Sequence, residues 1–311
     1  MIRFFQSKFA VTACMACVLQ MSVAAHDDPH DTVGRLTHRI EHQPKNADLY
    51  FKRAIEYRSV GKKEKAVLDF EKTINLSPKH LNAHVELAHL KLELEQFKKA
   101  KALAKEAIII ASNNEDKVLA HATCSDVYYA NHDLTEALAH IQKAIDLSKG
   151  VEVDHFLQRS HIQLKLNQPE ARIAGLLQGY KRSQSIVLHH AWIDANLDAG
   201  NREAVNAAIA KELKESRFKS SWWIRSARSL PKGSEQSKQM LTSAINEMDK
   251  RLNKQRPDVN LLFDFCLAHH LLDEKKKSQE YYAWLKKLHC DPRQKEWITM
   301  ILEKDSGEKT K

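Results

Sequence analysis

Residues 49–80 read LYFKRAIEYRSVGKKEKAVLDFEKTINLSPKH, and this stretch decides the fold. Small residues stand on either side of Gly61, which allows the chain to turn between two helices. We expect Ala54 and Ala66 to face each other where the helices touch, because a larger side chain would hold the helices apart. Pro78 cannot continue a helix, and it ends the unit. Large side chains fill the space around the close contact: Tyr50, Tyr57 and Phe70.

This stretch, counted from Ala47, resembles one unit of the tetratricopeptide repeat family, a pair of antiparallel helices in about 34 residues. Two residues depart from the family pattern: Arg53, where the family prefers Leu, and Thr73, where it prefers Ala. Weaker copies follow, in which the small residue of the second helix returns at intervals of 34, 37, 34 and 33 residues. These positions are Ala66, Ala100, Ala137, Ala171 and Ala204. The resemblance implies an all-α solenoid with five tetratricopeptide-like repeats over residues 47–220.

The composition favours helix along the whole chain, since only 8 of 311 residues are Gly and 7 are Pro. The repeat pattern decays beyond residue 220. We expect degenerate helical repeats and a capping helix over residues 221–304, because the last repeat of a solenoid exposes an apolar face. Residues 305–311 are predicted to be a disordered tail. The formal net charge is +9, but the basic residues are scattered and no nucleic-acid motif is present, so no nucleic-acid partner is expected.

Residues 1–25 are typical of a secretory signal peptide. Arg3 and Lys8 give a positive start, Phe9 to Leu19 form an apolar core, and small residues precede a cleavage site after Ala25. The mature protein is therefore predicted to be periplasmic or secreted, without a stable membrane anchor. An alternative treats Val11-Thr12-Ala13-Cys14 as a lipoprotein signal.

Residues 26–46 form an arm that contains four His and three Asp. We expect a flexible polar segment, with a short helix at Thr37 to His42. The alternative is a copper or zinc site at the mature N-terminus, where the terminal amine and imidazole of His26 chelate the metal and Asp28 or His30 adds a ligand.

No other motif indicates catalysis or a cofactor: the sequence lacks HExxH, GxSxG, a phosphate loop and GxGxxG. A stack of helix pairs is also expected to offer no enclosed pocket of the usual kind. We therefore predict a protein that is not an enzyme and holds no cofactor. Cys124 is expected in the core. Whether Cys266 and Cys290 pair is left open.

The resemblance further implies a binding surface. In this family the first helix of each repeat lines a concave face that binds partner proteins, through positions 2, 5, 9 and 12 of that helix. We therefore predict a scaffold or assembly factor that docks an extended or helical peptide of a partner protein on apolar anchors. The predicted contacts are Phe51, Ile55, Arg58, Val85, His89, Leu92, Asp126, Tyr129, Phe156 and Gln163.

Overall fold

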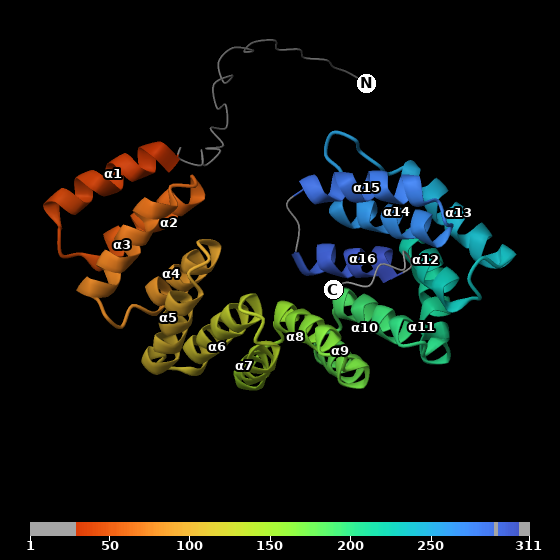
Figure 1. Cartoon of the computed structure of the whole chain (residues 1–311), viewed down its shortest axis with the longest axis horizontal. Coiled ribbons are helices and arrows are strands. Elements are labelled where there is room, and N and C mark those ends of the chain that lie inside the picture. The colour runs from red at the N-terminus through yellow and green to blue at the C-terminus, as the bar shows by residue number, and fades with distance from the viewer. Residues whose placement is uncertain (1–28, 289–291, 305–311) are drawn as a thin grey trace, which may run out of the picture. The chain divides into compact units, whose positions relative to one another are not determined.

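The structure is a computed structural model that describes residues 29–288 and 292–304. Within these ranges the chain folds into sixteen α-helices and no strands, which confirms the predicted all-α solenoid (Figure 1). The helices are α1 (Pro29–His42), α2 (Ala47–Ser59), α3 (Lys63–Leu76), α4 (Leu81–Glu93), α5 (Phe97–Ile110), α6 (Asn114–Ala130), α7 (Leu134–Leu147), α8 (Val153–Lys165), α9 (Pro169–Ser183), α10 (Ile186–Asp198), α11 (Arg202–Glu215), α12 (Ser220–Ser229), α13 (Glu235–Asp249), α14 (Val259–Leu271), α15 (Lys275–Lys287) and α16 (Pro292–Lys304).

The chain divides into two compact units between Ala83 and His84, in the first turn of α4. Consecutive helices pack as hairpins: α2 with α3 in the first unit, and α6 with α7, α8 with α9, α12 with α13 and α14 with α15 in the second. The predicted signal peptide and the tail at residues 305–311 lie outside the described residues, as does Cys290.

The first unit explains both departures from the family pattern. Arg53 donates two hydrogen bonds to the carboxylate of Asp69 on α3, at 2.7 and 2.8 Å, and a third to Thr37 on α1 at 3.1 Å. A Leu at this position would leave the buried Asp69 without a cation. Thr73 is fully buried, and its hydroxyl donates to the backbone carbonyl of Asp69 at 2.8 Å. Both side chains therefore replace apolar packing with satisfied polar contacts.

The N-terminal arm differs from the prediction, because α1 spans Pro29–His42 and is longer than the expected helix at Thr37 to His42. The reason is its apolar spacing: Leu36 and Ile40, four residues apart, are buried in a small cluster with Leu49 on α2. The backbone at His30 belongs to the first turn of this helix, whereas His26 and Asp28 lie outside the described residues.

Small residues allow the helices of the second unit to pack closely, as predicted for Ala100 and Ala137, which are fully buried. In the fourth and fifth repeats, the predicted inward position of the second helix was wrong by one residue. Ala171 is exposed and Arg172 takes the inward position of α9, while Val205 takes that of α11. Arg172 fits there because its guanidinium reaches polar partners on neighbouring helices.

Six hairpin turns share one geometry, in which the second residue after the first helix has a positive φ between 54° and 80°. The N–H of the next residue bonds back to the carbonyl five positions earlier, for example Lys62 to Tyr57 at 2.8 Å and Glu274 to His269 at 2.9 Å. This is the Schellman motif, which ends a helix by satisfying its last carbonyls. The left-handed residues are Gly61, Glu95, His132, Asn167, Gly200 and Asp273.

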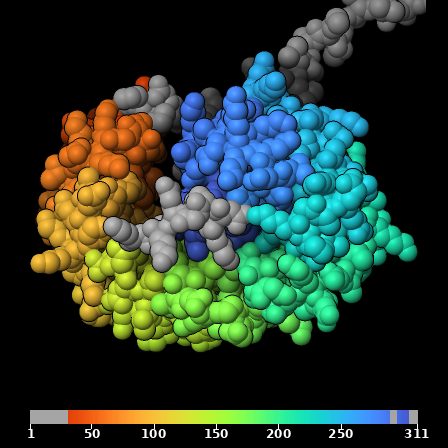
Figure 2. Space-filling view, turned by 45° about the vertical axis from the view of Figure 1, so that its right-hand side comes forward, coloured from red at the N-terminus to blue at the C-terminus, as the bar shows by residue number. Residues whose placement is uncertain are grey.

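The C-terminal helices of the second unit have their own core, around Leu262, Phe265 and Cys266 on α14. Helix α16 joins this core through Ile298, which is fully buried. The predicted capping helix therefore covers an apolar face of α14. In Figure 2 the blue C-terminal helices lie against the green helices of the same unit.

Candidate functional site

The predicted contacts on α2 lie in the first unit. Phe51, Ile55 and Arg58 are all half-buried. The ring of Phe51 packs between Phe70, at 5.7 Å between centroids, and His80, at 4.7 Å. Phe51 is thus held in place by two rings of its own repeat.

The contacts predicted on α4 and α6 lie in the second unit, and the structure brings two of them together. His89 Nε2 lies 3.4 Å from one carboxylate oxygen of Asp126, and the other oxygen accepts a hydrogen bond from Gln158 at 2.7 Å. Leu92 is half-buried at the edge of the core, whereas Val85 is buried with 4% of its surface exposed. The partly exposed side chains of His89, Leu92 and Asp126 form a patch, in which the Nε2 atom of His89 is itself buried.

The contacts predicted on α8 are buried, since Phe156 is 2% exposed and Gln163 is 7% exposed. Phe156 points toward the second helix of its repeat, where it meets Gly179. As placed here, these two side chains offer little surface to a partner. Near the C-terminus of α8, Lys165 is partly exposed and His161 is buried, and neither stands at the predicted contact positions 2, 5, 9 and 12.

Tyr129 lies in a cluster of side chains around Glu296 of α16. Its hydroxyl donates to Glu296 at 2.9 Å, His161 is hydrogen-bonded to the same carboxylate oxygen at 2.8 Å, and Lys165 donates to the other oxygen. Burial opposes ionisation of Glu296, but the bonds from Lys165, Tyr129 and His161 outweigh it and lower the pKa of this carboxyl. The first helices of the third and fourth repeats therefore hold an acidic side chain from a helix more than 130 residues away.

A network of ion pairs joins the helices next to this cluster. Asp194 on α10 accepts hydrogen bonds from Arg225 at 2.7 Å and Arg228 at 2.5 Å, both on α12. Asp198 accepts from Arg228 at 2.7 Å and from Arg172 on α9 at 3.0 Å. Burial alone would raise the pKa of Asp194, but the two arginines lower it. The network fixes the relative positions of α9, α10 and α12.

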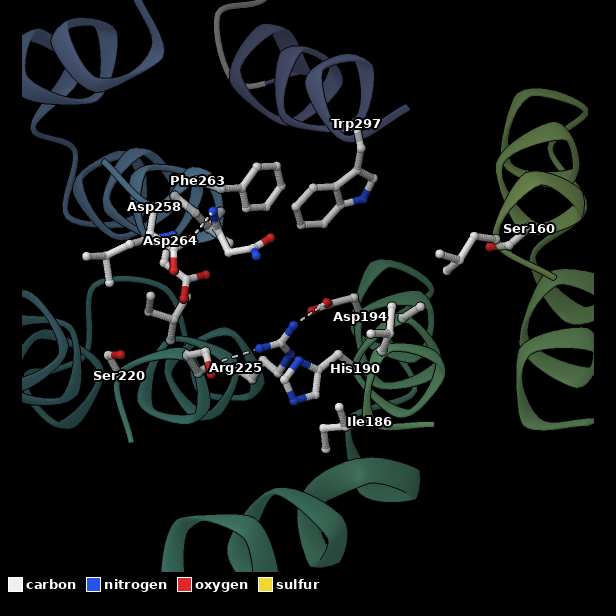
Figure 3. Close-up of a pocket in the computed structure, with 18 of the residues that line it drawn as sticks. Ser160, Ile186, His190, Asp194, Ser220, Arg225, Asp258, Phe263, Asp264 and Trp297 are labelled. Atoms are coloured by element: carbon white, nitrogen blue, oxygen red, sulfur yellow. Dashed lines mark hydrogen bonds and ion pairs between the residues drawn. The ribbon is translucent and has the colours of Figure 1, made fainter. Parts of the chain in front are cut away.

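A cavity of about 480 Å³ lies beside this network, between α8, α10, α12, α14 and α16 (Figure 3). No enclosed pocket was expected in stacked helix pairs, and this cavity is half open to solvent. The cavity exists because the C-terminal hairpins and α16 come back over the first helices of earlier repeats. Its apolar walls include Leu157, Ile186, Val187, Phe218, Phe263 and Trp297, and its polar groups include His190, Asp194, Arg225, Arg251, Asp258 and Asp264.

Asp264 is the unusual group in the cavity wall. Among the described residues, no group donates a hydrogen bond to its carboxylate. Burial raises its pKa to about 7, and Arg225 and Arg251 only partly oppose this effect. Burial also lowers the pKa of His190 to about 3, so its imidazole is neutral at pH 7. The Nε2 atom of His190 has no hydrogen-bond partner in the described part of the chain.

The histidines do not form a metal site in the described residues, where no group of three His, Cys, Asp or Glu side chains is arranged to hold a metal ion. His121 on α6 instead pairs with His140 of α7, at 2.9 Å between their Nδ1 atoms. Burial lowers the pKa of His121 to about 4, and repulsion by His140 contributes to the same shift. The described helices also contain no segment long and apolar enough to cross a membrane.

Comparison with known proteins agrees with this architecture. Residues 47–80 match the family described as tetratricopeptide repeat. None of the curated proteins compared with the chain matches it.

Among solved structures, a tetratricopeptide repeat protein from Parabacteroides merdae ATCC 43184 is similar over 83% of this chain and 97% of its own, with 10% identity and a TM-score of 0.55. YrrB, described as a TPR protein with an unusual peptide-binding site, covers 78% of this chain and 99% of its own, with 17% identity and a TM-score of 0.44. MamA from Desulfovibrio magneticus RS-1 covers 51% and 87%, with 18% identity and a TM-score of 0.45. The first similarity supports a tetratricopeptide-type fold.

Sequence reasoning missed Glu296, His161, Lys165 and Asp264. The first three become neighbours only when α16 returns to α6 and α8, and no local pattern encodes that contact. A signal did exist for Asp264, since it is a single acidic residue within the apolar run LLFDFCLAHHLL, residues 261–272. A charge in such a run is costly unless it is paired, and it therefore marks a candidate site.

Proposed function

We propose that this protein is a non-enzymatic interaction module, a scaffold or assembly factor that binds a segment of a partner protein on the first helices of its second unit. The patch of His89, Leu92 and Asp126 on α4 and α6 is the part of this face that we assign to the partner. It combines an apolar side chain with groups that donate and accept hydrogen bonds, which suits a helical or extended peptide.

The observation that supports this proposal is the position of α16. Its Glu296 receives hydrogen bonds from Tyr129 on α6 and from His161 and Lys165 on α8. The same face therefore accepts a helix, and it holds that helix through a polar side chain in a charge-assisted cluster. The patch on α4 and α6 extends this face toward earlier repeats.

The proposal includes export of the protein. It rests on residues 1–25, whose positive start, apolar core and small residues before position 26 are typical of a signal peptide. The partner is then another protein of the envelope or the exterior. N-terminal sequencing of the protein from the periplasmic or secreted fraction tests export. If no protein cleaved after Ala25 is found there, this part of the proposal is contradicted.

Affinity capture from the cell's own envelope fraction tests the binding face. We would compare the wild-type protein with His89→Ala/Asp126→Ala, which removes two polar groups that are 30% and 47% exposed. The matched control is Lys211→Ala/Glu215→Ala, which removes an exposed ion pair from the second helix α11. We expect a partner that the wild type and the control capture equally and that the patch variant loses at least tenfold. Equal capture by all three proteins, or no partner at all, would refute the assignment.

A further inference from the structure

The cavity in the second unit carries one acceptor that the protein leaves unused. Asp264 is half-buried on α14 and receives no hydrogen bond from the described residues. Figure 3 shows Asp264 of α14, Arg225 of α12 and His190 of α10 turned toward the same space. A carboxylate in such surroundings is costly to keep ionised without a hydrogen-bonded cation.

The arginines around the cavity do not supply that cation, because each of them is engaged elsewhere. Arg225 donates to Asp194 at 2.7 Å and to the carbonyl of Ser221 at 3.2 Å. Arg251 donates to the hydroxyl of Ser220 at 3.3 Å, and its guanidinium lies 4.1 Å from the ring centroid of Phe218. Neither guanidinium donates a hydrogen bond to Asp264, so its carboxylate has no hydrogen-bonded cation among the described residues.

We propose that this cavity binds a lysine or arginine side chain of the partner protein, with Asp264 as its anionic contact. The inference rests on the proposed function, since the cation is carried by the partner that docks on the first helices. The cavity adjoins the cluster around Glu296 on the same helices, because His161 of α8 belongs both to that cluster and to the cavity wall.

The walls suit the stem of a long basic side chain as well as its charged end. Phe263 and Trp297 stack on each other at 5.0 Å between centroids, and both line the cavity. The methylene groups of lysine or arginine pack on such apolar surface while the charged group reaches a polar partner. A volume of about 480 Å³ lies within the range of ordinary ligand pockets.

An anionic ligand fits the site poorly. His190 is neutral at pH 7, and Arg172 and Arg225 in the cavity wall are already bonded to Asp198 and Asp194. A carboxylate or phosphate would also meet the charge of Asp264. The recognition chemistry therefore favours a cation.

The proposal predicts a distinct pH dependence. Since the pKa of Asp264 is about 7 in the free protein, a cation must bind the ionised form and displace a proton at lower pH. Affinity should fall by up to tenfold for each pH unit below 7. The other charged or titratable groups that face Asp264 are Asp194 and His190 on α10, Arg225 on α12, Arg251 after α13, and Asp258 before α14.

Calorimetric titration of the full chain with short peptides tests the inference. The probe is acetyl-Leu-Lys-Leu-amide, and the matched probe replaces Lys by norleucine, which removes only the charged group. We expect the Lys peptide to bind at least ten times more tightly at pH 8, with the advantage shrinking at pH 6. Equal binding of both peptides, or no binding of the Lys peptide at millimolar concentration, overturns the proposal. Butylamine binding as tightly as the peptide also overturns it, because the ligand would then be a free amine.

Two variants assign the effect to one carboxylate. Asp264→Asn should abolish the preference for the Lys peptide and its pH dependence. Asp258→Asn is the control, because it removes a charge from the same wall at an exposed residue whose helix-capping bonds an Asn preserves. If both variants lose the preference for the Lys peptide equally, the negative charge of the wall as a whole would explain it, and the specific contact with Asp264 would be overturned. The capture experiment with the His89 and Asp126 variant tests the docking face, and the peptide titration tests the cavity. Either proposal can therefore fail while the other holds.

Discussion

Replacing Asp264 by Asn should stabilise the protein, and the gain should depend on pH. Asn has nearly the same shape but no charge, so the cavity wall keeps its packing. The wild-type carboxyl has a pKa of about 7, against an ordinary value of 3.8. Its unfavourable surroundings therefore act only on the ionised form.

The size of the effect follows from this difference in pKa. A rise of about 3 units corresponds to ~4 kcal/mol at 1.36 kcal/mol per unit. Below pH 4 the carboxyl is protonated in both the folded and the unfolded chain, and the cost is absent. Between pH 4 and 7 the folded protein binds more protons, so its free energy of unfolding falls as pH rises. Because Asp264 is only half-buried, we expect a gain of about 2 to 4 kcal/mol at pH 8 and about 40% of that at pH 5.

Urea unfolding at pH 5 and pH 8, followed by tryptophan fluorescence, measures this gain. All five tryptophans lie in the second unit, so the signal reports on the unit that contains the cavity. An equal gain at both pH values, or no gain at pH 8, would refute the reasoning. Either result would mean that Asp264 is solvated or paired in solution.

Three further substitutions test other contacts. Glu296→Ala removes the acceptor of three hydrogen bonds and should raise the amide exchange rate of α16 at least tenfold, measured by hydrogen–deuterium exchange. Gly179→Ala places a Cβ 2.6 Å from a ring carbon of Phe156 and should destabilise the second unit by about 1 to 3 kcal/mol in urea unfolding. Arg53→Leu restores the family residue but leaves the buried Asp69 unpaired, and it should destabilise the first unit by about 3 to 5 kcal/mol, measured by thermal unfolding.

Each of these has a matched control. Gly150→Ala meets nothing within 4 Å and should change stability by less than about 0.5 kcal/mol. Arg53→Leu/Asp69→Leu removes both charges and should be more stable than Arg53→Leu alone. Lys165→Ala should accelerate exchange in α16 less than Glu296→Ala, because it removes one bond of the three. A reversed order in any of these pairs would contradict the contacts described here.

The helical hairpins were predictable because each is encoded by nearby residues. Ala54 and Ala66 mark a close helix contact, and both are fully buried. Local residues also predicted the hairpins beyond residue 220, where apolar runs alternate with breaks such as Pro231. It failed for Ala171, because a buried Arg172 that is satisfied by partners on other helices does not resemble a small core residue.

The candidate sites were less predictable, because they depend on contacts between distant segments. The position rule chose Phe156 and Gln163 on α8, both of which are buried. It passed over His161, which is also buried but is hydrogen-bonded to Glu296, 135 residues further along the chain. A repeat pattern fixes which helices neighbour each other, but it does not show where a C-terminal helix comes to rest.

The shared turn geometry of the six hairpins has a consequence for how the chain folds. Each of these turns ends its helix through bonds to carbonyls at most five residues back, so the stop signal needs no contact with any other repeat. Most contacts within a hairpin are also short-range in sequence, and such contacts form quickly. Folding should therefore start at several hairpins independently and then spread between neighbours. The bonds between α16 and the helices α6 and α8 span the largest sequence distances, and they should form last.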